Sequence, residues 1–171
     1  VNVLRNDARA ALGIAVATGA RFIRVNVHTG SMWTDQSLIE GRAHETMRAR
    51  RELGMDVAVL ADVFVKHATP PTGATLEDAA KDTSHRGLAD ALIVSGRGTG
   101  LETELKDAQT VRAAAPDVPL LIGSGINVEN GPGLLAVADG AIVGSAVMNE
   151  GRPGSGIDPV RAAAFISAVR G

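Results

Sequence analysis

Six short apolar runs alternate with helical patterns along the chain, and this alternation limits the fold more than any other feature of the sequence. The predicted strands are Val1–Leu4, Phe22–Val27, Val57–Val63, Leu92–Ser95, Leu120–Ile122 and Ala141–Val143. The predicted helices that follow them are Asp7–Thr18, Asp35–Leu53, Leu76–Gly87, Glu102–Ala114, Val128–Val137 and Pro159–Val169. Strands and helices that alternate through short connections form a parallel sheet covered by helices.

Two architectures fit this order, an open doubly wound sheet and a (β/α)8 barrel. The predicted strands carry polar residues on one parity, namely Asn2, Arg24 with Asn26, and Asp62. A parallel sheet covered on both faces is apolar throughout, whereas a barrel can turn polar side chains towards a site at its mouth. We therefore predict a single α/β domain over residues 1–171, of the (β/α)8 TIM-barrel type with six units in this chain. The open doubly wound sheet is the alternative.

Composition excludes several classes of partner. The chain has 171 residues, a net charge of −2 and no cysteine, so it carries no basic footprint for nucleic acid and no disulfide or thiolate chemistry. No apolar run approaches the roughly 20 residues of a membrane span. We expect a cytoplasmic protein without a nucleic-acid partner or transmembrane segment.

The last two predicted strands both end in a Gly-Ser pair. Gly123, Ser124 and Gly125 follow the first of them, and Gly144 and Ser145 follow the second. In barrels of this class, ligand phosphate often lies at the loops after the last two strands, where backbone N–H groups point outward together. We predict that these residues bind phosphate. The alternative is that each pair only turns a strand into a helix.

Three residues at or after the end of a predicted strand are candidates for catalysis, namely Asp62, Lys66 and His67. A carboxylate paired with an ammonium group can move protons, a lysine can bind an anion or form a Schiff base, and a histidine can transfer protons near neutral pH. The alternatives are a buried ion pair and a solvated loop. The histidines lack metal-ligand spacing, so we predict no cofactor, with a divalent metal on Asp62 as the weaker alternative.

Polar residues on or beside the first two strands are candidates for substrate binding: Asn2, Asn6, Arg24 and Asn26. Arg24 is the strongest of them, because an inward arginine is costly unless it is paired. The alternative is a polar plug that stabilises the interior.

Two further loops are predicted to border the site. The glycine-rich segment Ser95–Gly100 lacks both dinucleotide-binding and P-loop spacing, and we expect Gly96 and Thr99 in it to contact substrate. The segment His28–Gly41 contains the only tryptophan, Trp33, and is a candidate lid.

Long segments of the chain resemble the BtpA family. They are VNVLRNDARAALGIAVATGARFIRVNVHTG, ADVFVKHATP, GLADALIVSGRGTG, LLIGSGINVEN and ADGAIVGSAV. The resemblance covers essentially all of the chain. It implies a (β/α)8 barrel of the ribulose-phosphate-binding type, in a family named after a photosystem I assembly factor. Family members carry two further N-terminal βα units, so the six units here correspond to strands 3–8 of that barrel.

Two functions follow as hypotheses. The first is a lyase or isomerase acting on a small phosphorylated, sugar-derived metabolite. The second is a non-catalytic assembly or regulatory factor for a membrane complex, peripheral on its cytoplasmic side. Open sheet edges favour association, so a homo-oligomer is also expected.

Overall fold

The main sheet has five parallel strands in the order β1-β4-β6-β7-β8. The computed structural model describes residues 1–4, 6–54, 56–96 and 103–170. The strands of the main sheet are β1 (Phe22–Val25), β4 (Ala58–Asp62), β6 (Ala91–Val94), β7 (Leu120–Ile122) and β8 (Gly140–Ala141). Strand order equals chain order, whereas a doubly wound sheet reverses its order at a switch point. The sheet is therefore wound in one direction, as in a barrel, and the doubly wound alternative is wrong.

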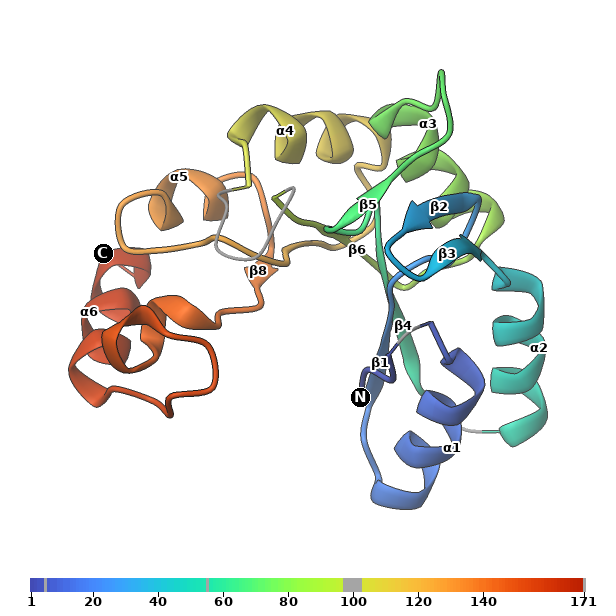
Figure 1. Cartoon of the computed structure of the whole chain (residues 1–171), viewed down its shortest axis with the longest axis horizontal. Coiled ribbons are helices and arrows are strands. Elements are labelled where there is room, and N and C mark those ends of the chain that lie inside the picture. Colours follow the sequence, from blue (N-terminus) through green and yellow to red (C-terminus); the bar gives the residue numbers. More distant parts are fainter. Residues whose placement is uncertain (5, 55, 97–102, 171) are drawn as a thin grey trace.

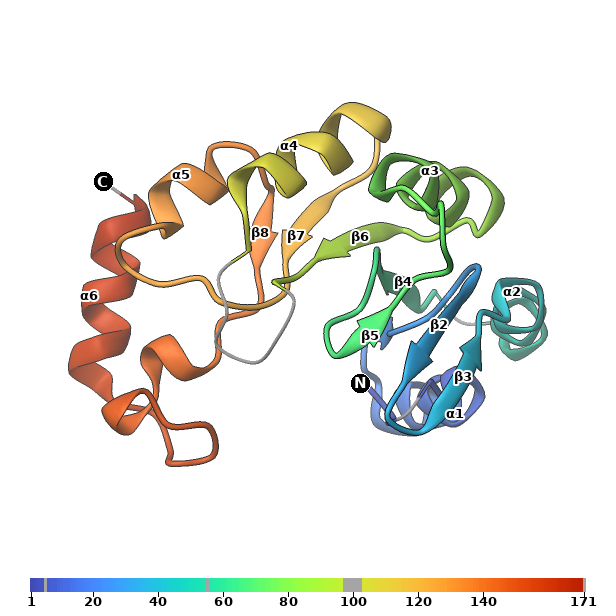
Figure 2. The same cartoon turned by 45° about the horizontal axis from the view of Figure 1, so that its top comes forward.

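The helices lie on the outer side of the curved sheet and follow one another around it (Figures 1 and 2). They are α1 (Ala8–Thr18), α2 (Ala43–Leu53), α3 (Leu76–Lys81), α4 (Leu105–Ala114), α5 (Gly131–Leu135) and α6 (Pro159–Arg170). A π-helical turn, η1 (Asp82–Arg86), continues α3, and the 3-10 turns η2 (Ser145–Val147) and η3 (Asn149–Gly151) precede α6. The first and last units stand at opposite ends of the arc, so these six units form a partial barrel.

Two predicted elements have a different type of secondary structure in the folded chain. The sequence predicts a loop up to Thr34 and a helix from Asp35, but residues 31–40 form a hairpin of β2 (Ser31–Thr34) and β3 (Ser37–Glu40). This hairpin pairs with β5 (Ala68–Thr69) in a second sheet. Antiparallel pairing between β2 and β3 and between β2 and β5 holds these residues as strands, and α2 begins only at Ala43. The predicted strand Val1–Leu4 is not regular, although the Arg24 N–H donates to the Val1 carbonyl over 2.8 Å.

The core has two apolar clusters, one on each part of the sheet. The first packs β1 and β4 against α1 and α2, and the second packs β6 and β7 against α3 to α6. Strand β6 is buried at every residue, as expected for a central parallel strand. Small side chains such as Ala11, Ala15 and Ala108 are fully buried, so helices can approach the sheet closely in a chain that has few aromatic residues.

At the end of the sheet opposite the predicted site, two aspartates make equivalent interactions. Asp90 precedes β6, pairs with Arg50 and accepts the Val59 N–H of β4 over 2.7 Å. Asp139 precedes β8, pairs with Arg112 of α4 and accepts the N–H of Leu120 in β7 over 2.8 Å. Each aspartate thus ties a helix and two neighbouring strands together, in a role that stabilises the fold.

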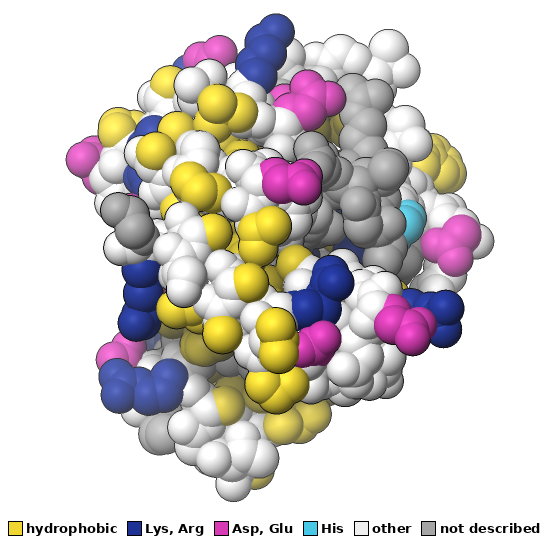
Figure 3. Space-filling model, turned by 90° about the vertical axis from the view of Figure 1, so that its left-hand side faces the viewer, with side chains coloured by type: hydrophobic (Ala, Val, Ile, Leu, Met, Phe, Trp, Pro, Cys, Tyr) yellow, Lys and Arg dark blue, Asp and Glu magenta, His cyan; other side chains and the backbone are white. Residues whose placement is uncertain are grey.

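Hydrophobic side chains gather on the face formed by the C-terminal elements (Figure 3). Exposed apolar residues in this part of the chain are Val128, Ile142, Ile157, Val160 and Ile166. Strand β8 is at the edge of the main sheet on this side. Both features are compatible with association, and the homo-oligomer stays a prediction.

Candidate functional site

A buried aspartate at the carboxyl end of β4 is the centre of the best-organised polar cluster. Arg24 donates to Asp62 through both Nε (3.0 Å, to Oδ2) and Nη2 (2.7 Å, to Oδ1). The Asn26 amide donates to Oδ2 over 2.8 Å. Arg24 and Asn26 have the same parity along β1 and its extension, which is why both side chains reach the neighbouring strand on one side of the sheet. Sequence parity predicted that Arg24 and Asn26 share a side, whereas the partner expected for Asp62 was Lys66 and the structure pairs Asp62 with Arg24.

Burial controls the charge of this cluster. The Asp62 side chain has no exposed surface, whereas 16% of the Arg24 side chain is exposed. Burial raises the pKa of the Asp62 carboxyl, and the hydrogen bonds and charge of Arg24 and the Asn26 amide oppose this shift. The carboxylate is thus held by three donated hydrogen bonds in a place where an unpaired charge would be costly.

The two N-terminal asparagines support the cluster from the chain segment beside β1. The Asn2 amide donates to the Arg24 carbonyl over 2.9 Å and to Asn26 Oδ1 over 3.2 Å. Asn6 has a positive φ of 68°, and its amide pairs with both the N–H (2.7 Å) and the carbonyl (2.8 Å) of Val27. Asn2 therefore positions the Asn26 side chain. The Asn6 side chain forms the pair of hydrogen bonds with the Val27 backbone that a neighbouring strand would otherwise form.

Lys66 and His67 lie on the segment between β4 and β5. Lys66 is half-buried, and its charge favours the ionised form of Asp62, as a smaller influence than that of Arg24. His67 is exposed and has a positive φ of 58°. The Lys66 charge thus acts on the Asp62 carboxylate, and the backbone at His67 has a left-handed conformation. The catalytic roles of both residues stay predictions.

The two Gly-Ser loops leave the same edge of the sheet, because β7 and β8 are parallel neighbours. The Gly123 N–H donates to the Val94 carbonyl over 2.7 Å and so belongs to the sheet. Ser124 is buried, and Gly125 turns the chain with a φ of +70°, a conformation that glycine adopts without steric cost. Gly144 precedes η2, in which Ser145 is the first residue.

The helix that follows the first of these loops is shorter than expected. Helix α5 begins at Gly131, six positions after Gly125, and has five residues. The intervening chain is organised by Asn127, whose side-chain oxygen accepts the N–H groups of Glu129 and Asn130. An anion at these loops would therefore meet loop N–H groups and hydroxyls rather than a long helix. Phosphate binding by these residues stays a prediction.

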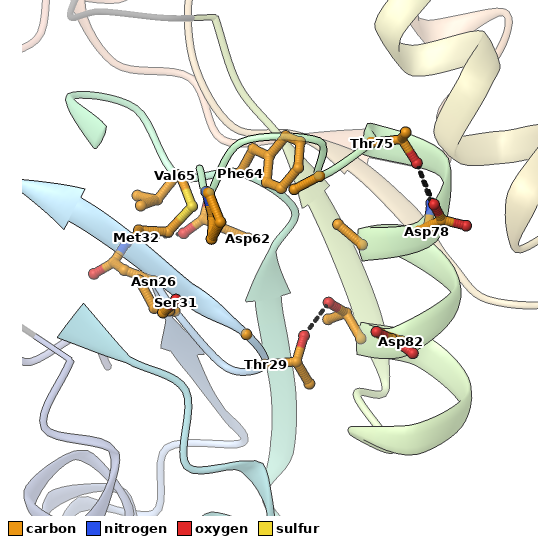
Figure 4. A pocket seen from close by; sticks show the side chains of 16 residues that line it. Asn26, Thr29, Ser31, Met32, Asp62, Phe64, Val65, Thr75, Asp78 and Asp82 are labelled. Atoms are coloured by element: carbon orange, nitrogen blue, oxygen red, sulfur yellow. Dashed lines mark hydrogen bonds between the residues drawn. The ribbon is translucent and has the colours of Figure 1, made fainter. Parts of the chain in front are cut away.

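A cavity of about 260 Å³ opens beside Asp62 and Asn26 (Figure 4). The hairpin contributes Ser31 and Met32 to the lining of this cavity. The cavity is lined by residues of the segment after β1, of β4 and the segment after it, of the hairpin, of the turn before α3, and of α3 and η1: Asn26, Val27, Thr29, Gly30, Ser31, Met32, Asp62, Phe64, Val65, Pro71, Ala74, Thr75, Asp78, Ala79, Asp82 and Thr83. Trp33 does not line it and is 56% exposed. The hairpin thus forms one wall of the cavity with Met32 and without Trp33, and its role as a lid stays a prediction.

Sequence reasoning missed the acidic side of this cavity, formed by Asp78 and Asp82. The local signal at Asp78 indicates a helix start, since the Thr75 hydroxyl accepts the Asp78 N–H and donates to its carboxylate. A larger hollow of about 490 Å³ lies between α1, α2 and the hairpin. Of the predicted site residues, it is lined by Asn6.

Three further expectations concern the glycine-rich loop, metals and membranes. Gly96 is buried after β6, and Thr99 lies outside the described residues. Within the described ranges, no three histidine or carboxylate side chains gather as a metal site would require. None of the described helices has the length and apolar character needed to cross a membrane.

The sequence matches the model of the BtpA family over residues 1–171. The chain belongs to the BtpA family. A photosystem I biogenesis protein, BtpA, from Synechocystis sp. is 52% identical over 99% of this chain. The match covers 59% of that relative, so the present chain spans about three fifths of its length.

Solved structures show which fold this BtpA family member has. Orotidine 5'-phosphate decarboxylase from Pyrococcus horikoshii OT3 matches 99% of the chain and 73% of its own length, with a TM-score of 0.64 and 16% identity. Phosphoribosyl anthranilate isomerase from Thermus thermophilus matches 95% and 66%, with a TM-score of 0.63 and 16% identity. At this identity the likeness is one of fold. It confirms the predicted TIM-barrel type for the BtpA chain.

Proposed function

We propose that this chain forms part of a barrel that binds a small phosphorylated, sugar-derived metabolite. The observation that carries the proposal is the position of two groups at the carboxyl ends of one parallel sheet. The Gly-Ser loops follow β7 and β8, and the Asp62–Arg24–Asn26 cluster stands at the ends of β4 and β1. Catalytic and phosphate-binding groups of TIM barrels gather at this end.

In this function, the loops bind the phosphate group and the cluster orients the rest of the ligand. Gly125, Gly144 and Ser145 supply loop N–H groups and a hydroxyl, while Asn26 and Arg24 fix the orientation of the Asp62 carboxylate. The cavity beside Asp62 accommodates the part of the ligand farthest from the phosphate. The two solved neighbours are named as enzymes of phosphorylated substrates, in keeping with this division.

The reaction that we propose is of the lyase or isomerase type, with acid–base chemistry at Asp62 and Lys66. Burial raises the pKa of Asp62, which brings a carboxyl closer to the range where it can exchange protons at working pH. Asp62→Asn and Lys66→Ala variants are expected to bind a substrate found by screening but to turn it over slowly. Wild-type turnover by both variants would remove these roles.

The binding step is tested by thermal unfolding and calorimetry with inorganic phosphate and ribose 5-phosphate. A ligand that binds only the folded chain raises its Tm. Ser145→Asp places a carboxylate in the second loop, and we expect it to abolish the Tm increase through charge repulsion. Gln36→Glu adds the same charge at the exposed tip of the hairpin and is expected to bind like the wild type. Equal binding by both variants would contradict the proposed position of the phosphate.

A second function, favoured by the Synechocystis relative, is assembly or regulation of a membrane complex. This chain would then act as a non-catalytic factor, attached peripherally on the cytoplasmic side, whereas the enzyme would be cytoplasmic. A wild-type chain that no phosphorylated compound stabilises would favour this second function.

A further inference from the structure

Ser95, the residue after β6, has a buried hydroxyl that the fold does not use. Its Oγ is one of two buried side-chain polar atoms without a hydrogen-bond partner among the described residues, the other being Nδ1 of His28. Buried polar groups in proteins are almost always hydrogen-bonded, and an unpaired one costs free energy of folding. Another buried serine hydroxyl has a partner in the fold, because Ser84 Oγ donates to the Ala80 carbonyl over 2.8 Å.

The position of this hydroxyl connects the two parts of the proposed site. Strand β6 lies between β4, which ends at Asp62, and β7, which leads into the first Gly-Ser loop. A Cβ atom on Gly123 would lie 2.4 Å from Ser95 Oγ and 3.4 Å from Arg24 Nη2. The hydroxyl therefore packs on the Cα side of Gly123, with the guanidinium that binds Asp62 close to the same point.

This packing also explains why the first residue of the loop is a glycine. The Gly123 N–H is used in the sheet, and its φ is not in the left-handed region. Any side chain at this position would overlap Ser95 Oγ and Ile93 Cγ2. Gly123 thus leaves room for the Ser95 hydroxyl between the loop and Arg24.

We propose that Ser95 Oγ hydrogen-bonds to the sugar portion of the phosphorylated ligand, as a specificity-determining contact between the phosphate loops and the Asp62 cluster. The inference rests on the proposed function. A hydroxyl can donate to a sugar oxygen or accept from a sugar hydroxyl, and a bound ligand gives the unpaired atom its partner. The free energy of folding that the unpaired hydroxyl costs the ligand-free chain is then explained by its role in ligand binding.

The test compares Ser95→Ala with Ser84→Ala in the whole chain. Each change removes one buried hydroxyl, but only Ser84 loses a hydrogen bond made in the fold. We expect Ser84→Ala to lower the Tm by roughly 2–4 °C and to bind ligands normally. Ser95→Ala is expected to keep or raise the Tm, to bind ribose 5-phosphate about tenfold more weakly, and to bind inorganic phosphate like the wild type.

The outcomes separate this inference from the proposed function. If the wild type binds ribose 5-phosphate and Ser95→Ala binds it equally well, the inference is overturned and the proposed function stands. The inference also falls if Ser95→Ala lowers the Tm as much as Ser84→Ala, since the hydroxyl would then have a partner within the protein. If the wild type binds neither compound, the proposed function fails and the inference fails with it.

Discussion

Replacing Arg24 with methionine tests the electrostatic reasoning about the site most directly. The change removes the guanidinium but keeps an unbranched apolar side chain. It leaves the Asp62 carboxylate, whose side chain has no exposed surface, with a hydrogen bond from the Asn26 amide. Breaking a buried ion pair by removing one partner costs about 3–5 kcal/mol. Because Arg24 is 16% exposed, we expect about 3 kcal/mol, near the lower end.

The cost of Arg24→Met is expected to depend on pH in a defined direction. Burial raises the pKa of Asp62 above 3.8 in the wild type, and Arg24 opposes this shift. Without Arg24 the folded pKa rises further, so the folded variant binds a proton at pH values where the unfolded chain has released it. Its stability then falls as pH rises above about 4. The difference from the wild type is smallest near pH 4 and largest at pH 7 to 8.

The assay is urea unfolding at pH 5.0 and pH 7.5, with two matched variants. Arg86→Met breaks an exposed ion pair, in which Arg86 and Asp82 are 83% and 55% exposed, and is expected to cost less than about 0.5 kcal/mol. The double variant Arg24→Met/Asp62→Asn removes the buried charge and should recover much of the lost stability. The reasoning is refuted if Arg24→Met costs no more than Arg86→Met, or if its cost does not change with pH.

Two further predictions concern titrating groups away from the cluster. Burial lowers the pKa of His28 below 6.5, although its Nε2 bonds to the Gly87 carbonyl. As pH falls, the unfolded chain therefore protonates His28 before the folded chain does, and the wild-type free energy of unfolding should fall by up to about 1.4 kcal/mol between pH 7.5 and pH 5.5. His28→Gln should reduce this pH dependence, and an unchanged pH dependence would argue against the role of His28. The Leu120 N–H and then Arg112 lower the pKa of Asp139, so its contribution is present above pH 3.8 and lost as pH falls. Because the Asp139 side chain is 55% exposed, Asp139→Asn should lower the free energy of unfolding by only about 1 kcal/mol at pH 7 and by almost nothing near pH 2.5. Chemical unfolding at the two pH values measures this difference, and an equal loss at both would contradict the pairing.

The sequence alone determined that the main sheet is parallel and that Arg24 and Asn26 share one of its faces. Alternating apolar runs and helical patterns specify a parallel sheet, and side chains two residues apart in a strand must share a face. That is why Arg24 and Asn26 could be predicted to lie on one face, with Asp62 as a further polar strand residue. The family resemblance, carried by long motifs, added the barrel type.

Only the tertiary structure decided which polar groups meet and which remain unpaired. The hairpin at 31–40 was missed because this short segment is stabilised by pairing with β5, a contact that the local sequence pattern does not contain. The Asp78 and Asp82 side of the cavity depends on how α3 lies against the strand ends. The unpaired Ser95 hydroxyl and the space that Gly123 leaves for it are likewise results of packing between neighbouring strands. Such contacts arise between residues far apart in the sequence, so periodicity and spacing cannot specify them.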